Sequence, residues 1–151
     1  MDFSVFLTGL HNLVRWLVVI AGLLAFVTML TGMTGGRRYG PGDRRAGLIF
    51  QIVMDIQLLV GIVLFGVSPL IRAGMQNMSV AMGDSQLRFF FMEHTAMMVL
   101  AVAMVHIGFS QTKNEGLSDR ARFSRGVIFY GLSLVLIALA TPWGRSLIPW
   151  V

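Results

Sequence analysis

The chain has 151 residues, of which 56% are hydrophobic and 13% charged, and its mean hydropathy is +0.75. Because soluble domains carry roughly 25% charged residues, this composition excludes an ordinary soluble domain and predicts an integral membrane protein. The formal charge of +5 comes from basic residues gathered in two short connections, and no basic stripe interleaves with aromatic residues, so we expect no nucleic-acid partner.

Four apolar segments follow one another along the chain, and each is long enough to span the hydrocarbon core of a bilayer, which takes roughly 20 residues. They run from about Val5 to Leu30, Gly47 to Ile71, Leu87 to Phe109 and Val127 to Ile148. The first segment has no basic stretch before it and no A-x-A motif after it, so we expect it to stay in the mature protein. Pro142 is expected to kink or end the last helix.

The connections predict how these helices lie in the membrane. Both "TGGRRYGPGDRR" and "QTKNEGLSDRARFSR" are rich in arginine, so the positive-inside rule puts them in the cytoplasm and both termini outside. Short connections favour an up-down-up-down four-helix bundle, which we expect as a single domain over residues 1–151 in the bacterial cytoplasmic (inner) membrane. The outer connection "RAGMQNMSVAMGDSQ" spaces Met75, Met78 and Met82 as a short helix on the membrane surface would.

Ionisable side chains are rare within the apolar segments. Each costs on the order of 2.5–3.5 kcal/mol on insertion scales, so we expect them to face the bundle interior and to find partners. The set consists of His11, Arg15, Asp55, Glu93, His94 and His106.

Depth predicts which histidines meet. With a rise of 1.5 Å per residue, His11 lies roughly 9 Å and His94 roughly 10 Å below the outer boundary. Their helices are diagonal neighbours in an up-down-up-down bundle, so the two imidazoles are placed to act as axial ligands of one haem iron. His106 lies nearer the cytoplasmic side without a histidine at its depth, and we leave its role open between helix packing and function.

Arg15 lies one helical turn after His11 and shares its face. Since Asp55 and Glu93 are the carboxylates within the apolar segments, we expect Arg15 to pair with one or both of them. These three residues would form the charged surroundings of the cofactor. Arg88, at the outer mouth of its helix, is a further candidate for holding a haem propionate.

The absence of cysteine excludes disulfides, thiolate metal sites, iron–sulfur clusters and covalent attachment of a c-type haem. Any cofactor must then be held by histidine, methionine or carboxylate. Methionine sulfur favours Cu(I), so Met75, Met78 and Met82 also permit copper handling, although methionine more often fills gaps in apolar bundles.

Four motifs carry a resemblance to a known group of proteins: "HNLVRW", "QLLVGIVLFGVSP", "RFFFMEHTAMM" and "TPW". Together they cover nearly the full length, and the chain resembles small bacterial four-helix membrane proteins labelled as cytochrome b. The resemblance implies that His11 and His94 face a haem, with Arg15 and Glu93 in the same motifs. Three histidines can supply one bis-histidine haem but not the two pairs of a dihaem cytochrome.

Three functions remain open from the sequence. The first is a b-type cytochrome-like protein with one haem b near the outer face, exchanging electrons with quinol or with a partner's cofactor. The second is an accessory subunit of a respiratory or photosynthetic complex, with or without a tetrapyrrole. The third is copper handling. Electron transfer or an accessory role is expected over a stand-alone enzyme.

Overall fold

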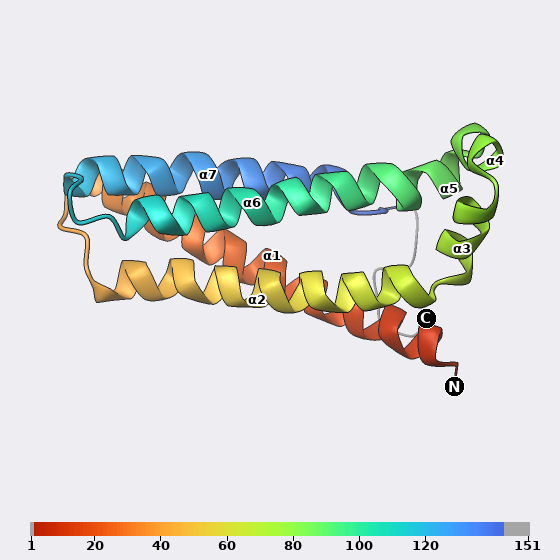
Figure 1. The fold of residues 1–151 in the computed structure, drawn as a ribbon. Coiled ribbons are helices and arrows are strands. Elements are labelled where there is room, and N and C mark those ends of the chain that lie inside the picture. Colours follow the sequence, from red (N-terminus) through yellow and green to blue (C-terminus); the bar gives the residue numbers. More distant parts are fainter. Residues whose placement is uncertain (1, 144–151) are drawn as a thin grey trace.

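The computed structural model describes residues 2–143, and every regular element in that range is a helix (Figure 1). Four helical segments are long and apolar enough to cross a membrane: α1 (Phe3–Gly35), α2 (Pro41–Val67), the segment Ser85–Thr112 and α7 (Asp119–Ala140). The third comprises α5 (Ser85–Arg88), the π-helix η1 (Phe89–Glu93) and α6 (His94–Thr112). Two short helices, α3 (Pro69–Gln76) and α4 (Met78–Gly83), join α2 to α5.

The four long segments form a bundle in which α1 and α6 lie on opposite corners. α1 packs against α2 and α7, and α6 packs against the same two helices. The connections 36–40 and 113–118 lie at one end, and α3 and α4 lie at the other, so consecutive long helices run antiparallel (Figure 1). The predicted up-down-up-down order and the diagonal placement of the two histidine-bearing helices are confirmed.

The first two long helices differ from the bounds that apolarity predicts. α2 ends at Val67, before the predicted Ile71, because Pro69 begins the separate helix α3. α1 continues past Leu30 to Gly35 and stops where Gly36 takes the left-handed conformation, with φ of 61°. α2 begins at Pro41, before the predicted Gly47, because proline suits the first helical position and the Asp43 carboxylate accepts the Gly40 N–H at 2.8 Å. A hydropathy pattern predicts only the apolar part of a helix, whereas the capping residues determine where the helix begins and ends.

The last helix begins well before the predicted residue 127. The Ser118 hydroxyl accepts the Ala121 N–H at 3.3 Å and caps the helix, so α7 starts at Asp119. It ends at Ala140, shortly before Pro142, as expected for a proline that stops a helix. The predicted end near residue 148 lies outside the described residues.

The connection between α2 and α5 forms two helices where the sequence predicts one. Asn77 separates α3 from α4, and its side chain accepts the Val80 N–H at 3.2 Å. Met75, Met78 and Met82 are exposed, with relative accessibilities of 54%, 50% and 40%. The three methionines therefore remain at the surface of this end of the bundle.

The long helices carry apolar side chains on both their inner and their outer faces. A buried cluster runs through all four helices and includes Met29, Phe50, Val105 and Tyr130. Large apolar side chains also point outward; Leu24, Leu59 and Leu139 are the most exposed examples, each with more than 60% of its surface accessible. Helices that are apolar all round suit the interior of a bilayer.

Close helix contact depends on glycine at the interface between α1 and α7. A Cβ added to Gly32 would overlap the ring of Phe123, whereas a Cβ added to Gly35, in the last turn of the same helix, would meet no atom within 4 Å. We therefore expect Gly32→Ala to destabilise the bundle by about 1–3 kcal/mol through overpacking. Gly35→Ala is the matched control and should leave stability close to that of the parent.

The measurement is thermal unfolding of the detergent-solubilised protein, followed by tryptophan fluorescence. Gly32→Ala should lower the melting temperature by several degrees relative to both the parent and Gly35→Ala. Equal melting temperatures for the two alanine variants would show that the α1–α7 contact does not require glycine at residue 32.

Candidate functional site

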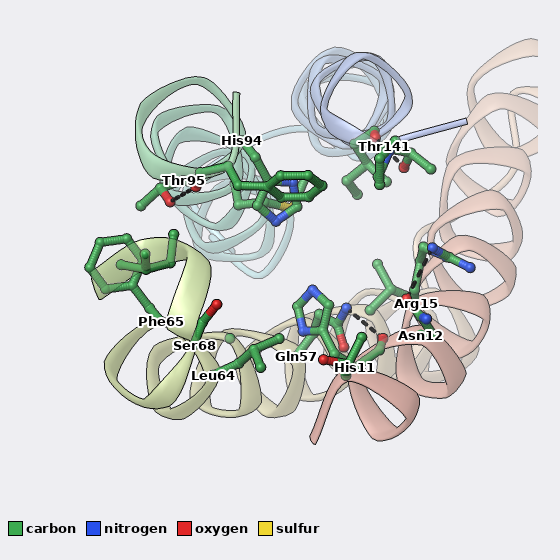
Figure 2. Close-up of a pocket in the computed structure, with 18 of the residues that line it drawn as sticks. His11, Asn12, Arg15, Gln57, Leu64, Phe65, Ser68, His94, Thr95 and Thr141 are labelled. Atoms are coloured by element: carbon green, nitrogen blue, oxygen red, sulfur yellow. Dashed lines mark hydrogen bonds between the residues drawn. The ribbon is translucent and has the colours of Figure 1, made fainter. Parts of the chain in front are cut away.

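His11 of α1 and His94 of α6 meet across the diagonal of the bundle. Their ring centroids lie 6.2 Å apart, and the ring planes make an angle of 65°. Figure 2 shows the two imidazoles pointing into the space between the helices that carry them. The prediction that these histidines lie at one level on diagonal helices is confirmed.

The end of α7 orients the His94 ring. The last carbonyls of a helix have no partner within the helix, and the Ala140 carbonyl oxygen lies 2.8 Å from His94 Nδ1. Because a carbonyl oxygen can only accept, Nδ1 must carry the proton of this hydrogen bond. In the uncharged ring, Nε2 then keeps its lone pair and can bind a metal or accept a hydrogen bond.

The π-helix η1 positions His94 from the other side. This turn precedes α6, and its wider hydrogen bonding includes one from the His94 backbone N–H to the Phe89 carbonyl. Thr95 adds a hydrogen bond from its hydroxyl to the Phe90 carbonyl at 3.1 Å. A π-turn shifts the angular position of every later residue, and such turns occur frequently at functional sites.

His11 is held from α2 but keeps an unsatisfied ring nitrogen. Gln57 Nε2 donates to the backbone carbonyl of His11 at 3.0 Å, which links the two helices. His11 Nδ1 and Gln57 Oε1 are buried, and neither finds a hydrogen-bond partner within residues 2–143. Buried polar atoms are nearly always paired, so a bound molecule or water is the expected partner of both.

A cavity of about 200 Å³ separates the helices at this level, with His11 and His94 in its wall (Figure 2). Its polar lining includes side chains from several helices and from the residues that follow α2 and α7: Thr8, Asn12, Arg15, Ser68, Thr95 and Thr141. Its apolar lining includes Met54, Phe65, Met98 and Ile137. The sequence identified the two histidines and Arg15 but not these walls.

A second lobe, also of about 200 Å³, opens between α2 and α6. It shares His11, His94, Gln57 and Gly61 with the first lobe, so the two lobes adjoin, and together they are called the slot. Its outer lining is apolar and consists of Leu58, Ile62, Val99 and Val102.

Arg15 lines the slot beside His11, as predicted from their spacing. It is buried, its Nη1 donates to Asn12 Oδ1 at 3.3 Å, and its guanidinium lies 5.6 Å from the centre of the Trp16 ring. The predicted ion pair with Asp55 or Glu93 is wrong, because within residues 2–143 each of these carboxylates pairs with a different side chain.

The two carboxylates, Glu93 and Asp55, bind partners outside the slot. Glu93 Oε1 lies 2.8 Å from Arg88 Nε, and Asp55 Oδ1 lies 2.8 Å from His106 Nε2. Asp55, Glu93 and Arg88 do not line the slot, so their predicted place around one cofactor stays a prediction that the slot does not support.

Both pairings have a physical reason. Arg88 and Glu93 are five residues apart, a spacing that ordinary α-helix would put on different faces but that the π-turn Phe89–Glu93 brings together. Asp55 of α2 and His106 of α6 lie at the same level of the bundle. Matching carboxylates by depth, as the histidines were matched, would have found this second pair.

The orientation of His94 can be measured without any cofactor. Because Nδ1 donates to the Ala140 carbonyl, we expect the uncharged His94 ring to carry its proton on Nδ1, whereas exposed neutral histidines favour Nε2. Two-bond ¹H–¹⁵N correlation spectra of ¹⁵N-histidine-labelled protein at neutral pH report this directly, with His94→Gln assigning the signal. A His94 ring protonated on Nε2 alone would contradict the hydrogen bond.

No family model, no curated protein and no solved structure matches this chain. The resemblance to small cytochrome b-like membrane proteins therefore stays an expectation from the four motifs. The function has to be inferred from the slot, its two histidines and the apolar helices that enclose them.

Proposed function

We propose that this chain spans the bacterial cytoplasmic membrane with four helices and binds one haem b between α1 and α6, as a b-type cytochrome or cytochrome-like subunit. The facing imidazoles of His11 and His94 carry the proposal, since their centroids lie 6.2 Å apart. An imidazole nitrogen lies about 2 Å from a first-row metal, so two imidazoles on opposite sides of one metal have centroids about 6 Å apart. The separation suits axial ligation.

The hydrogen bonds of the two histidines also suit metal ligation. A backbone carbonyl on the second ring nitrogen is a common way to orient a ligating histidine, and the Ala140 carbonyl serves His94 in this way. His11 has a buried ring nitrogen for which the described residues offer no partner, as expected of a residue whose partner is a ligand. When bound, haem supplies a one-electron redox centre whose potential depends on its ligands and surrounding charge.

The walls of the slot match an amphipathic planar group. Met54, Met98 and Phe65 offer apolar contact, and Gly61 leaves room beside His11, because a Cβ there would already approach His11 Cε1 to 3.4 Å. Arg15 brings a buried positive charge to the polar part of the slot, where it would suit an anionic propionate. These residues would orient the group and exclude water.

The distribution of charge supports the proposed membrane orientation. Both arginine-rich connections lie at the same end of the bundle, opposite α3 and α4 (Figure 1). The basic residues at this end are Arg37, Arg38 and Lys113 in the connections, Arg44 and Arg45 at the start of α2, and Arg120, Arg122 and Arg125 at the start of α7. By the positive-inside rule this end faces the cytoplasm, which puts the haem slot nearer the outer face.

Membership of a respiratory or photosynthetic complex is a separate proposal that the same site permits. A haem-binding bundle can work alone or as a subunit, and copurification in mild detergent distinguishes the two. Recovery of the chain purely as a free monomer or homodimer would count against an accessory role.

Haem binding predicts a specific pattern among the three histidines. The protein, expressed with added haem precursor, should purify with about one haem per chain, measured as the pyridine haemochrome and in the reduced-minus-oxidised spectrum. His11→Ala and His94→Ala should each remove or reshape the spectrum, because each removes an imidazole that would hold the haem iron.

His106→Ala is the matched control, because His106 lies outside the slot and pairs with Asp55. It should retain the haem spectrum of the parent. Absence of any haem spectrum from the parent protein would rule out the cytochrome function, as would equal haem loss in all three variants.

Two glycines of α2 give a test that leaves both histidines intact. Gly61→Leu directs a large side chain toward His11 and into the slot, so haem content should fall by about tenfold or more while the variant still elutes as a folded protein. Gly66→Leu is the control, because a Cβ at Gly66 meets no atom within 4 Å. Equal haem content in the two leucine variants would place the haem elsewhere.

A further inference from the structure

A second polar pair lies on the outside of the bundle, where α2 and α6 meet. His106 Nε2 and Asp55 Oδ1 are 2.8 Å apart, and the two side chains are 45% and 39% exposed. Asp55 lies about 20 Å from either end of α2, among the exposed apolar side chains of Ile52, Ile56 and Leu59. Ionisable groups at membrane depth normally face the bundle interior or a cavity, so an outward-facing pair requires its own explanation.

The pair adjoins the lateral opening of the slot. Leu58 and Ile62 lie one and two helical turns after Asp55 on α2, and Val102 and Val99 lie one and two turns before His106 on α6. These four residues form the apolar outer lining of the second lobe. The polar pair and the opening therefore share one surface, which we call the α2–α6 groove and define by these six residues.

The pair has hydrogen-bonding capacity left over. One nitrogen of the His106 ring and one oxygen of the Asp55 carboxyl group take part in the bond between them, and each group has a second polar atom. Within the described part of the chain, His106 Nδ1 and Asp55 Oδ2 make no further hydrogen bond. In the uncharged ring Nδ1 accepts a hydrogen bond from a hydroxyl, and in the charged ring it donates one to a carbonyl.

We propose that the α2–α6 groove binds a lipid-soluble quinone or quinol, whose ring oxygen meets His106 and Asp55 and whose apolar ring and chain lie against Leu58, Ile62, Val99 and Val102. Lipid acyl chains have no group that could form a hydrogen bond with the pair at this depth. A quinol hydroxyl could donate to Nδ1 of the uncharged His106 ring, and a quinone carbonyl could accept from Nδ1 of the charged ring. The inference rests on the proposed membrane insertion and deepens the proposed function, because it names the substrate class beside the haem slot.

The test is binding of decylubiquinone and its reduced form to the full-length protein in nanodiscs, with protein-free nanodiscs as the partition control. The parent should bind saturably. His106→Ala and Asp55→Asn should each weaken binding by about tenfold, because each leaves the ring oxygen without its partner. Ile107→Ala, a neighbouring exposed residue outside the groove, is the control and should bind like the parent.

Two further variants keep the result interpretable. Val99→Trp fills the opening without touching the polar pair and should also reduce binding, which covers the case in which a polar variant fails to fold. His94→Ala should lose haem yet keep quinone binding, so failure of the haem proposal and failure of this one are distinguishable.

Binding no greater than that of empty nanodiscs, or binding that the His106, Asp55 and Val99 variants leave unchanged, would overturn the inference. A second copy of the chain is the competing occupant of the groove. The protein has no cysteine, so an Ile56→Cys variant reports such a dimer as a disulfide-linked band. Efficient cross-linking that added decylubiquinone does not reduce would assign the groove to self-association.

Discussion

In the proposed bilayer, a helix bundle has no solvent with which to satisfy its polar groups, and this constraint accounts for where many polar side chains lie. Many of them bond to a neighbouring helix. Gln57 bonds to the His11 carbonyl, the Ser133 hydroxyl donates to the Ala101 carbonyl at 3.1 Å, and His106 pairs with Asp55. Within the described residues, three buried side-chain atoms lack a hydrogen-bond partner: His11 Nδ1, Gln57 Oε1 and Tyr39 Oη. The first two belong to residues in the wall of the slot, where the proposed ligand would supply a partner.

Two local irregularities of the helices position His94 in the wall of the slot. Pro142 stops α7 at Ala140 and so leaves a carbonyl for His94 Nδ1, while the π-turn before α6 sets the direction from which that ring enters the bundle. The same π-turn pairs Arg88 with Glu93 outside the slot. The orientation of His94 therefore depends on the end of α7 and on the π-turn as well as on the identity of the residue.

The sequence predicted the large-scale features because they follow from periodic physical rules. The length of the apolar segments predicted four long helices, and their order along the chain predicted that α1 and α6 lie diagonally opposite. The fixed rise per residue of an α-helix predicted that His11 and His94 lie at the same level. The sequence was wrong about Arg15, Asp55 and Glu93, because pairing by elimination ignored His106 and the π-turn. The slot walls depend on contacts between distant residues, which no local pattern in one sequence encodes.

An experimental density map of the purified protein, inspected between α1 and α6 before any ligand is built, tests the haem assignment most directly. The expected result is flat density of macrocycle size that lies between His11 and His94 and connects to a ring nitrogen of each. Side chains, lipid or ordered water filling the slot, with no planar density in protein supplied with haem, would contradict it.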